Sequence, residues 1–113
     1  MKHPLIRKFD RYRYLDLDDI LILKLIGDGL SFSATAKALG LTPPAISHRI
    51  KKYEMIWEGF SIFIPKGKSQ PRVFSPAFCK AHKIANQMLE AFHEEFSHLH
   101  SVSYDGDKLR IAG

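Results

Sequence analysis

Two short helical segments joined by a very short turn are the feature that most constrains how this chain folds. Residues 34–39 read as one short helix, Gly40 ends it, and Thr42-Pro43 starts another. Threonine is a good helix cap, and proline suits the first helical position because it has no amide to leave unbonded. A steep helix crossing needs a small residue, a left-handed turn residue and an apolar plug, which Ala36, Gly40 and Ile46 supply in that order. The pattern predicts a helix-turn-helix.

A core helix is expected before this motif. The segment from about Asp18 to Asp28 is apolar on most sides, and Asp16 or Asp18 can cap its first turn. Ser31 and Ser33 both offer caps for the next helix, and we prefer Ser33 because the helical pattern follows it directly. The second helix of the motif should run from Pro43 to about Met55.

The remainder predicts a small hairpin and one long helix. Residues 62–64 and 72–74 are short apolar runs around a tip of Pro, Gly and Lys. Ser75-Pro76 repeats the cap-plus-proline signal and opens a helix that should extend to about Leu99. After a turn-rich, linker-like stretch, residues 108–111 read as half of a strand that lacks a partner.

The predicted fold is therefore mainly α. We expect a winged helix-turn-helix, with a three-helix core and a small β-hairpin wing, followed by a long dimerisation or linker helix. The expected divisions are an N-terminal extension (1–14), the winged helix-turn-helix (15–75), the long helix (76–100), and a hinge with the first strand of a further domain (101–113).

Charge is segregated along the chain. The net charge is +5, yet between Gly29 and Leu89 the only acids are Glu54 and Glu58. A basic middle segment favours a polyanionic partner such as nucleic acid, although an ordinary solvated surface is the alternative. Cys79 is the only cysteine, which excludes an internal disulfide and favours a reducing cytoplasm. We see no secretory signal and no apolar run long enough for a membrane span.

The exposed face of the second helix predicts the contacts with double-stranded DNA. Short polar side chains lie near its start and long basic ones follow, as expected of a helix that enters the major groove. Ser47 and His48 are expected at base edges, and the basic side chains at base or backbone. The basic hairpin tip is either a wing on phosphate or a solvated loop. The candidate contacts are Ser33, Thr42, Pro43, Pro44, Ser47, His48, Arg49, Lys51, Lys52, Lys66, Lys68 and Arg72.

Apolar residues recur along the long helix at steps of three, four or seven, which predicts a seam between two subunits. The expected dimer contacts are Phe78, Ala81, Ala85, Met88 and Phe92.

These segments together resemble the N-terminal domain of LysR-type transcriptional regulators of bacteria, over about residues 15–99. The most specific stretch is residues 31–47, with Ile50 and Tyr53-Glu54 continuing it. In that family Ser/Thr-Gln-Pro-Ala-aliphatic-Ser opens the recognition helix, and Pro43 here replaces the glutamine. The usual wing arginine is also absent, and Lys66 and Lys68 stand near its place.

The resemblance implies a homodimer on a partly palindromic site, and often a tetramer in the intact regulator. Residues 72–76 resemble the entry into the family's linker helix, and residues 108–111 resemble the first strand of its effector-binding domain. A small-molecule effector is implied only where that further domain is present. No cofactor is expected.

Two other classes of function compete with DNA binding. An enzyme is disfavoured because the chain has no glycine-rich phosphate loop, nucleophile elbow or Cys-x-x-Cys pair. A zinc site is disfavoured because His93 and His98 are five residues apart, so a helix turns them about 140° from each other. The other rival is a protein-interaction module that uses the long helix.

Overall fold

A computed structural model describes residues 1–64, 72–105 and 108–111, with side chains described as far as His100 and none for 65–71. The chain is elongated, with principal extents of 65 × 40 × 24 Å. Its elements in order are α1 (Pro4–Phe9), η1 (Asp10–Tyr12), α2 (Leu17–Gly27), α3 (Phe32–Leu39), α4 (Pro43–Ile56), α5 (Pro76–Ser97), η2 (His98–Ser101), β1 (Val102–Asp105) and β2 (Lys108–Ile111). No helix in the described ranges has the length and apolarity that crossing a bilayer requires. The mainly α class predicted from the sequence is confirmed.

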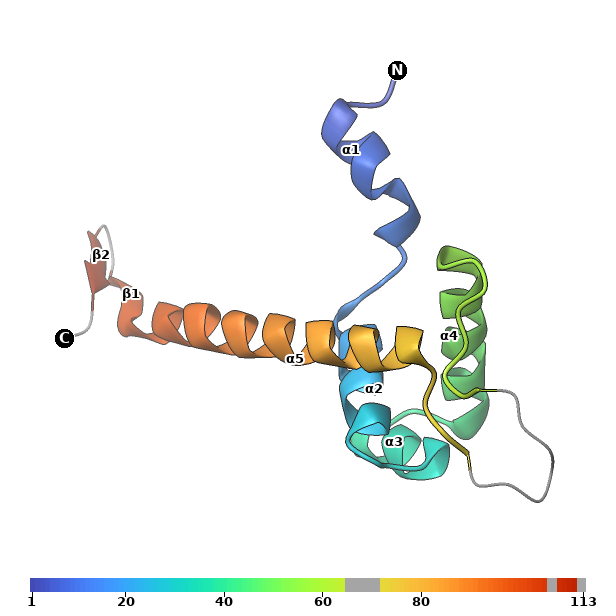
Figure 1. The fold of residues 1–113 in the computed structure, drawn as a ribbon. Coiled ribbons are helices and arrows are strands. Elements are labelled where there is room, and N and C mark those ends of the chain that lie inside the picture. The colour runs from blue at the N-terminus through green and yellow to red at the C-terminus, as the bar shows by residue number, and fades with distance from the viewer. Residues whose placement is uncertain (65–71, 106–107, 112–113) are drawn as a thin grey trace.

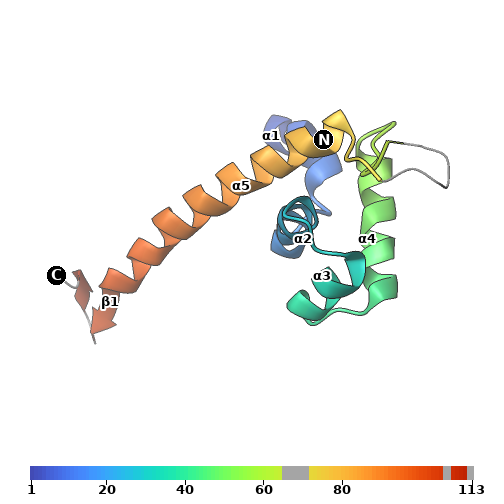
Figure 2. The ribbon, with the colours of Figure 1, turned by 60° about the horizontal axis from the view of Figure 1, so that its bottom comes forward.

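Helices α2, α3 and α4 form one compact body, and α5 packs against α2 before it projects away (Figures 1 and 2). The core of this body is apolar and nearly closed to solvent. It consists of Ile22, Leu23, Ile26, Ala36, Ile46, Tyr53, Phe60, Ile62, Phe78 and Ala85. Because α5 contributes two of these residues, its first half belongs to the same folding unit as the helix-turn-helix.

The turn between α3 and α4 has the geometry that the sequence predicts. Gly40 has φ = 69°, in the left-handed region that favours glycine. The Leu41 amide donates to the Ala36 carbonyl at 2.8 Å, which closes the end of α3. Ala36 and Ile46 are both fully buried. The helix-turn-helix prediction is therefore confirmed at the three positions on which it depends.

Three helix caps follow the sequence prediction, and one does not. Asp16 caps α2 in a reciprocal pair with Asp19, and Thr42 and Ser75 cap α4 and α5. The expected cap at Ser33 is wrong. Ser31 accepts from the Ala34 amide at 3.0 Å, and α3 begins two residues earlier than predicted. The half-buried Phe32 joins the helix and stacks against Phe63, with ring centroids 6.2 Å apart.

The base of the expected hairpin is present. Phe63 and Phe74 form an antiparallel bridge, and their rings stack at 5.5 Å. The Ile64 amide donates to the Val73 carbonyl and the Ser75 amide to the Ile62 carbonyl, both at 2.8 Å. The predicted tip, including Lys66 and Lys68, lies outside the described residues.

Both ends of the chain form helices or strands that were not predicted from the sequence. The N-terminal extension contains α1 and η1, and rises from the body on one side of α5 (Figure 1). At the other end β1 pairs antiparallel with β2, Val102 opposite Ile111. The linker-like interpretation is thus corrected over 102–105, and so is the unpartnered strand at 108–111. Valine and tyrosine, at positions 102 and 104, are residue types that are common in strands.

Candidate nucleic-acid interface

Helix α4 has one buried face and one exposed face. Ile46 and Tyr53, seven residues apart, are fully buried against the body. On the other side Pro44, Ser47 and Lys51 are exposed, at steps of three, four and seven that place them in one row. His48 lies beside this row and is exposed as well. The structure thus brings together four of the predicted DNA contacts on one surface.

Arg49 and Lys52, also predicted to contact DNA, point the other way. The Arg49 guanidinium lies 2.8 Å from an oxygen of Asp16 and 3.0 Å from one of Asp19. The Lys52 ammonium lies 2.7 Å from the other oxygen of Asp19 and donates to the Tyr14 carbonyl at 2.8 Å. Both cations are therefore engaged with the start of α2 and its approach.

Asp19 is the centre of this cluster and is fully buried. The Tyr53 hydroxyl also donates to it, at 2.7 Å. Burial alone would raise the pKa of Asp19, but hydrogen bonds from Lys52, Tyr53, the Asp16 amide and Arg49 outweigh it and hold the pKa below 3.8. Burial and the Asp19 carboxylate together raise the pKa of Tyr53, so this phenol stays protonated.

The cluster changes which charges α4 can offer to a partner. The hydrogen bond that Arg49 donates to Asp16, together with its hydrogen bond to Asp19, raises the pKa of Arg49, which stays charged and bound to the acids. Helix α4 is described over its full length. Of its lysine and arginine side chains, Arg49 and Lys52 are in these ion pairs, and Lys51 is exposed and outside them. The exposed face is consequently less basic than the sequence alone indicates.

A second group of predicted contacts meets beside the hairpin base. Ser33 and Arg72 line the same shallow hollow of about 430 Å³, next to the start of α3. The Arg72 guanidinium stacks over the Phe63 ring at 5.0 Å, which holds it at the surface. The Thr42 hydroxyl instead caps α4, where it accepts a hydrogen bond from the Ala45 amide at 3.3 Å. Pro43 is exposed beside it.

Sequence reasoning missed the Asp19 cluster. Its members on α4 lie 30 to 34 residues from Asp19, so spacing within one helix did not reveal them. A signal was present, because α2 is otherwise almost wholly apolar, and an acid in the first turn of such a helix must be exposed or paired.

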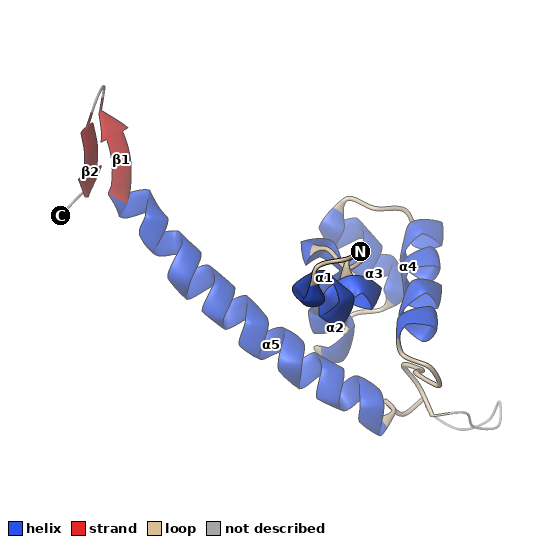
Figure 3. Cartoon of the chain, turned by 90° about the horizontal axis from the view of Figure 1, so that it is seen from above, coloured by secondary structure: helices blue, strands red, loops and turns tan. Residues whose placement is uncertain are grey.

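The residues of the predicted dimer seam of α5 differ in how far the chain itself buries them. Phe78 and Ala85 are each 1% exposed and belong to the core, whereas Met88 and Phe92 are 49% and 47% exposed. Ala81 is half-buried beside the core. The reason is that α2 covers the apolar face of α5 only along its first turns, and the same face emerges uncovered where α5 leaves the body (Figure 3). The exposed stripe continues through Phe96 and Leu99.

A steeply crossed helix pair, with a left-handed turn residue and an outward-facing second helix, defines a helix-turn-helix DNA-binding domain. Residues 17–59, which span α2 to α4, match the model of the family described as bacterial regulatory helix-turn-helix protein, lysR family. This segment is thus similar to the helix-turn-helix DNA-binding domain of LysR-family regulators, which supports a general role in DNA-binding transcription regulation. No curated protein matches the chain.

Proposed function

We propose that this chain binds a specific double-stranded DNA sequence as a homodimer, with α4 of each copy in the major groove. The observation that carries this proposal is the exposed row of Pro44, Ser47 and Lys51, with His48 beside it, on a helix whose opposite face is locked into the core. A helix fits the width of the major groove, where each base pair shows its own pattern of donors and acceptors.

The exposed side chains differ in what they offer to DNA. Ser47 and His48 each carry groups that donate and accept hydrogen bonds, and they lie in the first half of α4, so we assign base contacts to them. Lys51 lies one turn later and suits a phosphate. Arg72 and Ser33, across the hollow beside the hairpin, suit phosphates that flank the groove.

Arg49 and Lys52 act differently in this proposal. Their ion pairs with Asp16 and Asp19 join the outer side of α4 to the start of α2. We assign them the role of orienting α4, so that its exposed row stands at a fixed angle to the body. Releasing either cation to DNA would leave the buried Asp19 carboxylate with one partner fewer, at a cost in stability.

The dimer rests on the uncovered part of α5. Met88, Phe92, Phe96 and Leu99 form an exposed apolar stripe at steps of three or four, which a second copy would shield from water. Two copies related by a twofold axis would present two α4 helices to a partly palindromic site.

The experiment is selection of bound duplexes from a random pool, followed by fluorescence anisotropy on the selected duplex and on a scrambled one. Ser47→Ala and His48→Ala should each weaken binding to the selected duplex by about 1–3 kcal/mol and weaken scrambled DNA less. His93→Ala, on the distal part of α5, is the matched control and should leave both affinities unchanged. Equal losses on the two duplexes would assign these side chains to the DNA backbone.

The rival function is a protein-interaction module, which the exposed stripe of α5 favours. A protein-interaction module predicts that the purified chain enriches no duplex from the random pool at low salt. DNA binding predicts an enrichment that weakens steeply as the salt concentration increases.

A further inference from the structure

The N-terminal extension and α5 enclose an apolar trough. We call residues 1–14 the arm, and the trough is the cavity of about 530 Å³ that lies between the arm and α5 and is open to solvent on one side. All but one of its lining residues carry apolar or aromatic side chains, the exception being Asp16. Sites for small ligands measure about 300–1,000 Å³, so the trough has the volume of such a site.

The trough is long and follows α5. Its floor is the row of Ala81, Ile84, Ala85, Met88 and Phe92, which share one side of the helix. At 1.5 Å per residue this row extends for about 16 Å. The arm, the start of α2 and the end of α4 supply the remaining walls. An extended alkyl chain fits this shape better than a compact ring does.

The walls of the trough are positioned but remain exposed to water. Phe9 meets Tyr12 edge-on, and Tyr12 packs against Trp57, each pair with ring centroids 6.5 Å apart. The Tyr14 carbonyl, at the base of the arm, accepts a hydrogen bond from Lys52 at 2.8 Å. Even so, Phe9 is 46% exposed. An exposed apolar surface on a positioned segment indicates that another molecule covers it.

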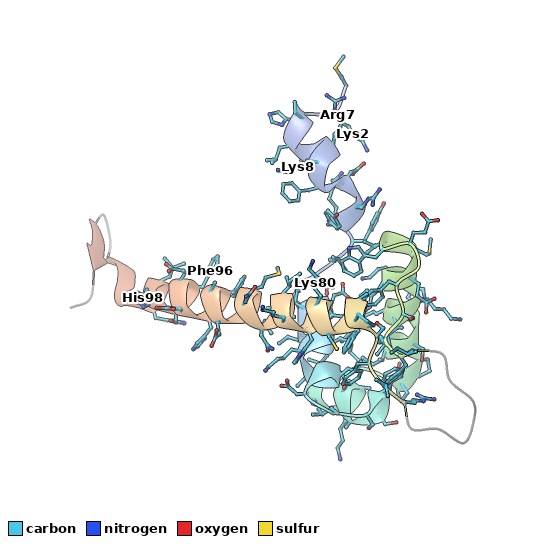
Figure 4. All side chains as sticks on the ribbon, viewed as in Figure 1. Lys2, Arg7, Lys8, Lys80, Phe96 and His98 are labelled. Carbon is cyan, nitrogen blue, oxygen red and sulfur yellow. The ribbon has the colours of Figure 1, made fainter. Side chains whose placement is uncertain are left out.

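Positive charge surrounds the trough. The Lys8 ammonium lies 5.6 Å from the centre of the Phe9 ring, which is part of the trough wall. Lys80 precedes the floor residue Ala81 and lies on the side of α5 from which the arm rises (Figure 4). The ion pairs among the described residues engage neither ammonium, so both are left for an anionic group. The cations of the arm, against the single acid Asp10, are Lys2, Arg7, Lys8, Arg11 and Arg13.

The one carboxylate in the trough is already bound. Asp16 accepts a hydrogen bond from the Arg49 guanidinium at 2.8 Å and another from the Asp19 amide at 3.0 Å. A cationic ligand would compete with Arg49 for this carboxylate and would approach a basic arm. An anionic ligand is attracted by the arm and by Lys80. Charge thus favours a negatively charged head group.

We propose that the trough binds a small amphipathic carboxylate of the fatty-acid class. Its alkyl chain lies along the floor from Ala81 to Phe92, and its carboxylate pairs with Lys8 and Lys80. This ligand site goes beyond the DNA contacts of α4 and does not depend on them. The two surfaces are close, because Asp16 belongs both to the trough and to the ion pairs that join α2 to α4.

A second copy of the chain is the other candidate occupant, since Met88 and Phe92 also belong to the exposed stripe of α5. The inner wall of the trough lies outside that stripe. It consists of Tyr12, Ile20 and Trp57, from η1, α2 and the end of α4. A flexible alkyl chain can contact this wall as well as the floor. Dependence on protein concentration separates the two occupants.

Trp57 reports on occupancy, because it is the only tryptophan and lines the trough. The test is titration of the full chain with decanoate, below micelle-forming concentrations and at several protein concentrations. We expect a saturable shift of the Trp57 emission to shorter wavelengths as the alkyl chain replaces water. Decanol, the uncharged analogue, should bind about three- to thirtyfold more weakly, which is the gain expected from two exposed ion pairs. The cation decyltrimethylammonium should bind more weakly still.

Ile84 and Leu99 provide a matched pair of variants. They are exposed apolar residues, at 45% and 57%, and of the two only Ile84 lines the trough. Ile84→Glu should weaken decanoate binding by about tenfold or more, because the alkyl chain would lie against a charge. Leu99→Glu adds the same charge outside the trough and should leave the affinity unchanged. Far-UV circular dichroism checks that both variants keep their helices.

The head-group contact is tested by combining Lys8→Gln with Lys80→Gln. This double variant should bind decanoate only as tightly as decanol, and its affinity for decanol should equal that of the wild type. Lys37→Gln, which removes an exposed lysine of α3, is the control and should change neither affinity.

The outcomes separate this inference from the proposed function. Equal binding of the three probes, or tightest binding of the cation, would overturn the ligand site. A Trp57 emission that shifts with protein concentration alone and does not respond to decanoate would show a second copy in the trough and overturn it as well. A chain that enriches a duplex and ignores decanoate would refute the ligand site alone. A chain that binds decanoate and enriches no duplex would refute the DNA proposal alone.

Discussion

Replacing Asp19 by asparagine tests whether the buried carboxylate joins α2 to α4. Asp19 is fully buried and receives hydrogen bonds from Lys52 and Tyr53 at 2.7 Å and from Arg49 at 3.0 Å. Breaking a buried ion pair costs about 3–5 kcal/mol, and a hydrogen bond to a charged group contributes about 1.5–3 kcal/mol. Asparagine keeps one acceptor oxygen but turns an amide donor toward the cations. We therefore expect a loss of about 2–4 kcal/mol in the free energy of unfolding.

Urea unfolding measures this loss directly. Trp57, the only tryptophan, lies 6.2 Å from the Tyr53 ring and 5.5 Å from the Phe60 ring, so its fluorescence reports on the core. At about 1–3 kcal/mol per molar of urea, a loss of about 2–4 kcal/mol lowers the urea midpoint by about 0.7–4 M. The control is Asp18→Asn, a carboxylate that is 43% exposed and 3.9 Å from Arg49. It should cost at most about 1 kcal/mol. Equal losses in the two variants would refute the reasoning.

The difference between wild type and Asp19→Asn should depend on pH. The pKa of Asp19 is lowered from 3.8 in the folded state. A lowered folded pKa means that the carboxylate stabilises the fold above the unfolded pKa, and that this contribution is lost as the pH falls through the folded pKa. The difference in free energy of unfolding between wild type and Asp19→Asn should be largest at pH 7 and should decrease below about pH 4.

Three further predictions concern the interface and the turn. Lys51→Ala should reduce the slope of log affinity against log salt by about 1, whereas Arg49→Ala should lower stability and leave that slope nearly unchanged. Replacing Lys66 and Lys68 together by alanine should reduce the slope by up to about 2 if both meet phosphates, and an unchanged slope would remove the hairpin tip from the interface. Gly40→Ala should lower the thermal midpoint, since the left-handed backbone costs an alanine about 1–2 kcal/mol although no atom lies within 4 Å of the added carbon.

Local signals predicted most of the fold. Thr42-Pro43 and Ser75-Pro76 marked two helix starts correctly, because capping is decided within four residues. Gly40 marked the turn for the same reason. Ser31 and Ser33 gave equally good local signals, and the choice between them depended on the packing of Phe32 against Phe63, which is a tertiary contact.

Surface assignments were harder to predict than elements. Periodicity placed Lys51 and Lys52 side by side on a basic helix, but their surroundings differ because acids from α2 reach only one of them. Burial along α5 was hard to predict for a similar reason, since Phe78 and Ala85 of the predicted seam lie in the core of the same chain. Periodicity shows that a face is apolar, and the position of α2 decides where along the helix that face is already covered.

The sharing of Phe78 and Ala85 between α5 and the core also has a mechanical consequence. With two anchors seven residues apart, the base of α5 cannot pivot on the body without opening the hydrophobic interior. Helix α5 and the body of α2, α3 and α4 therefore move as one rigid unit. Tilting the distal end of α5 reorients this body, and with it the angle at which α4 meets a duplex.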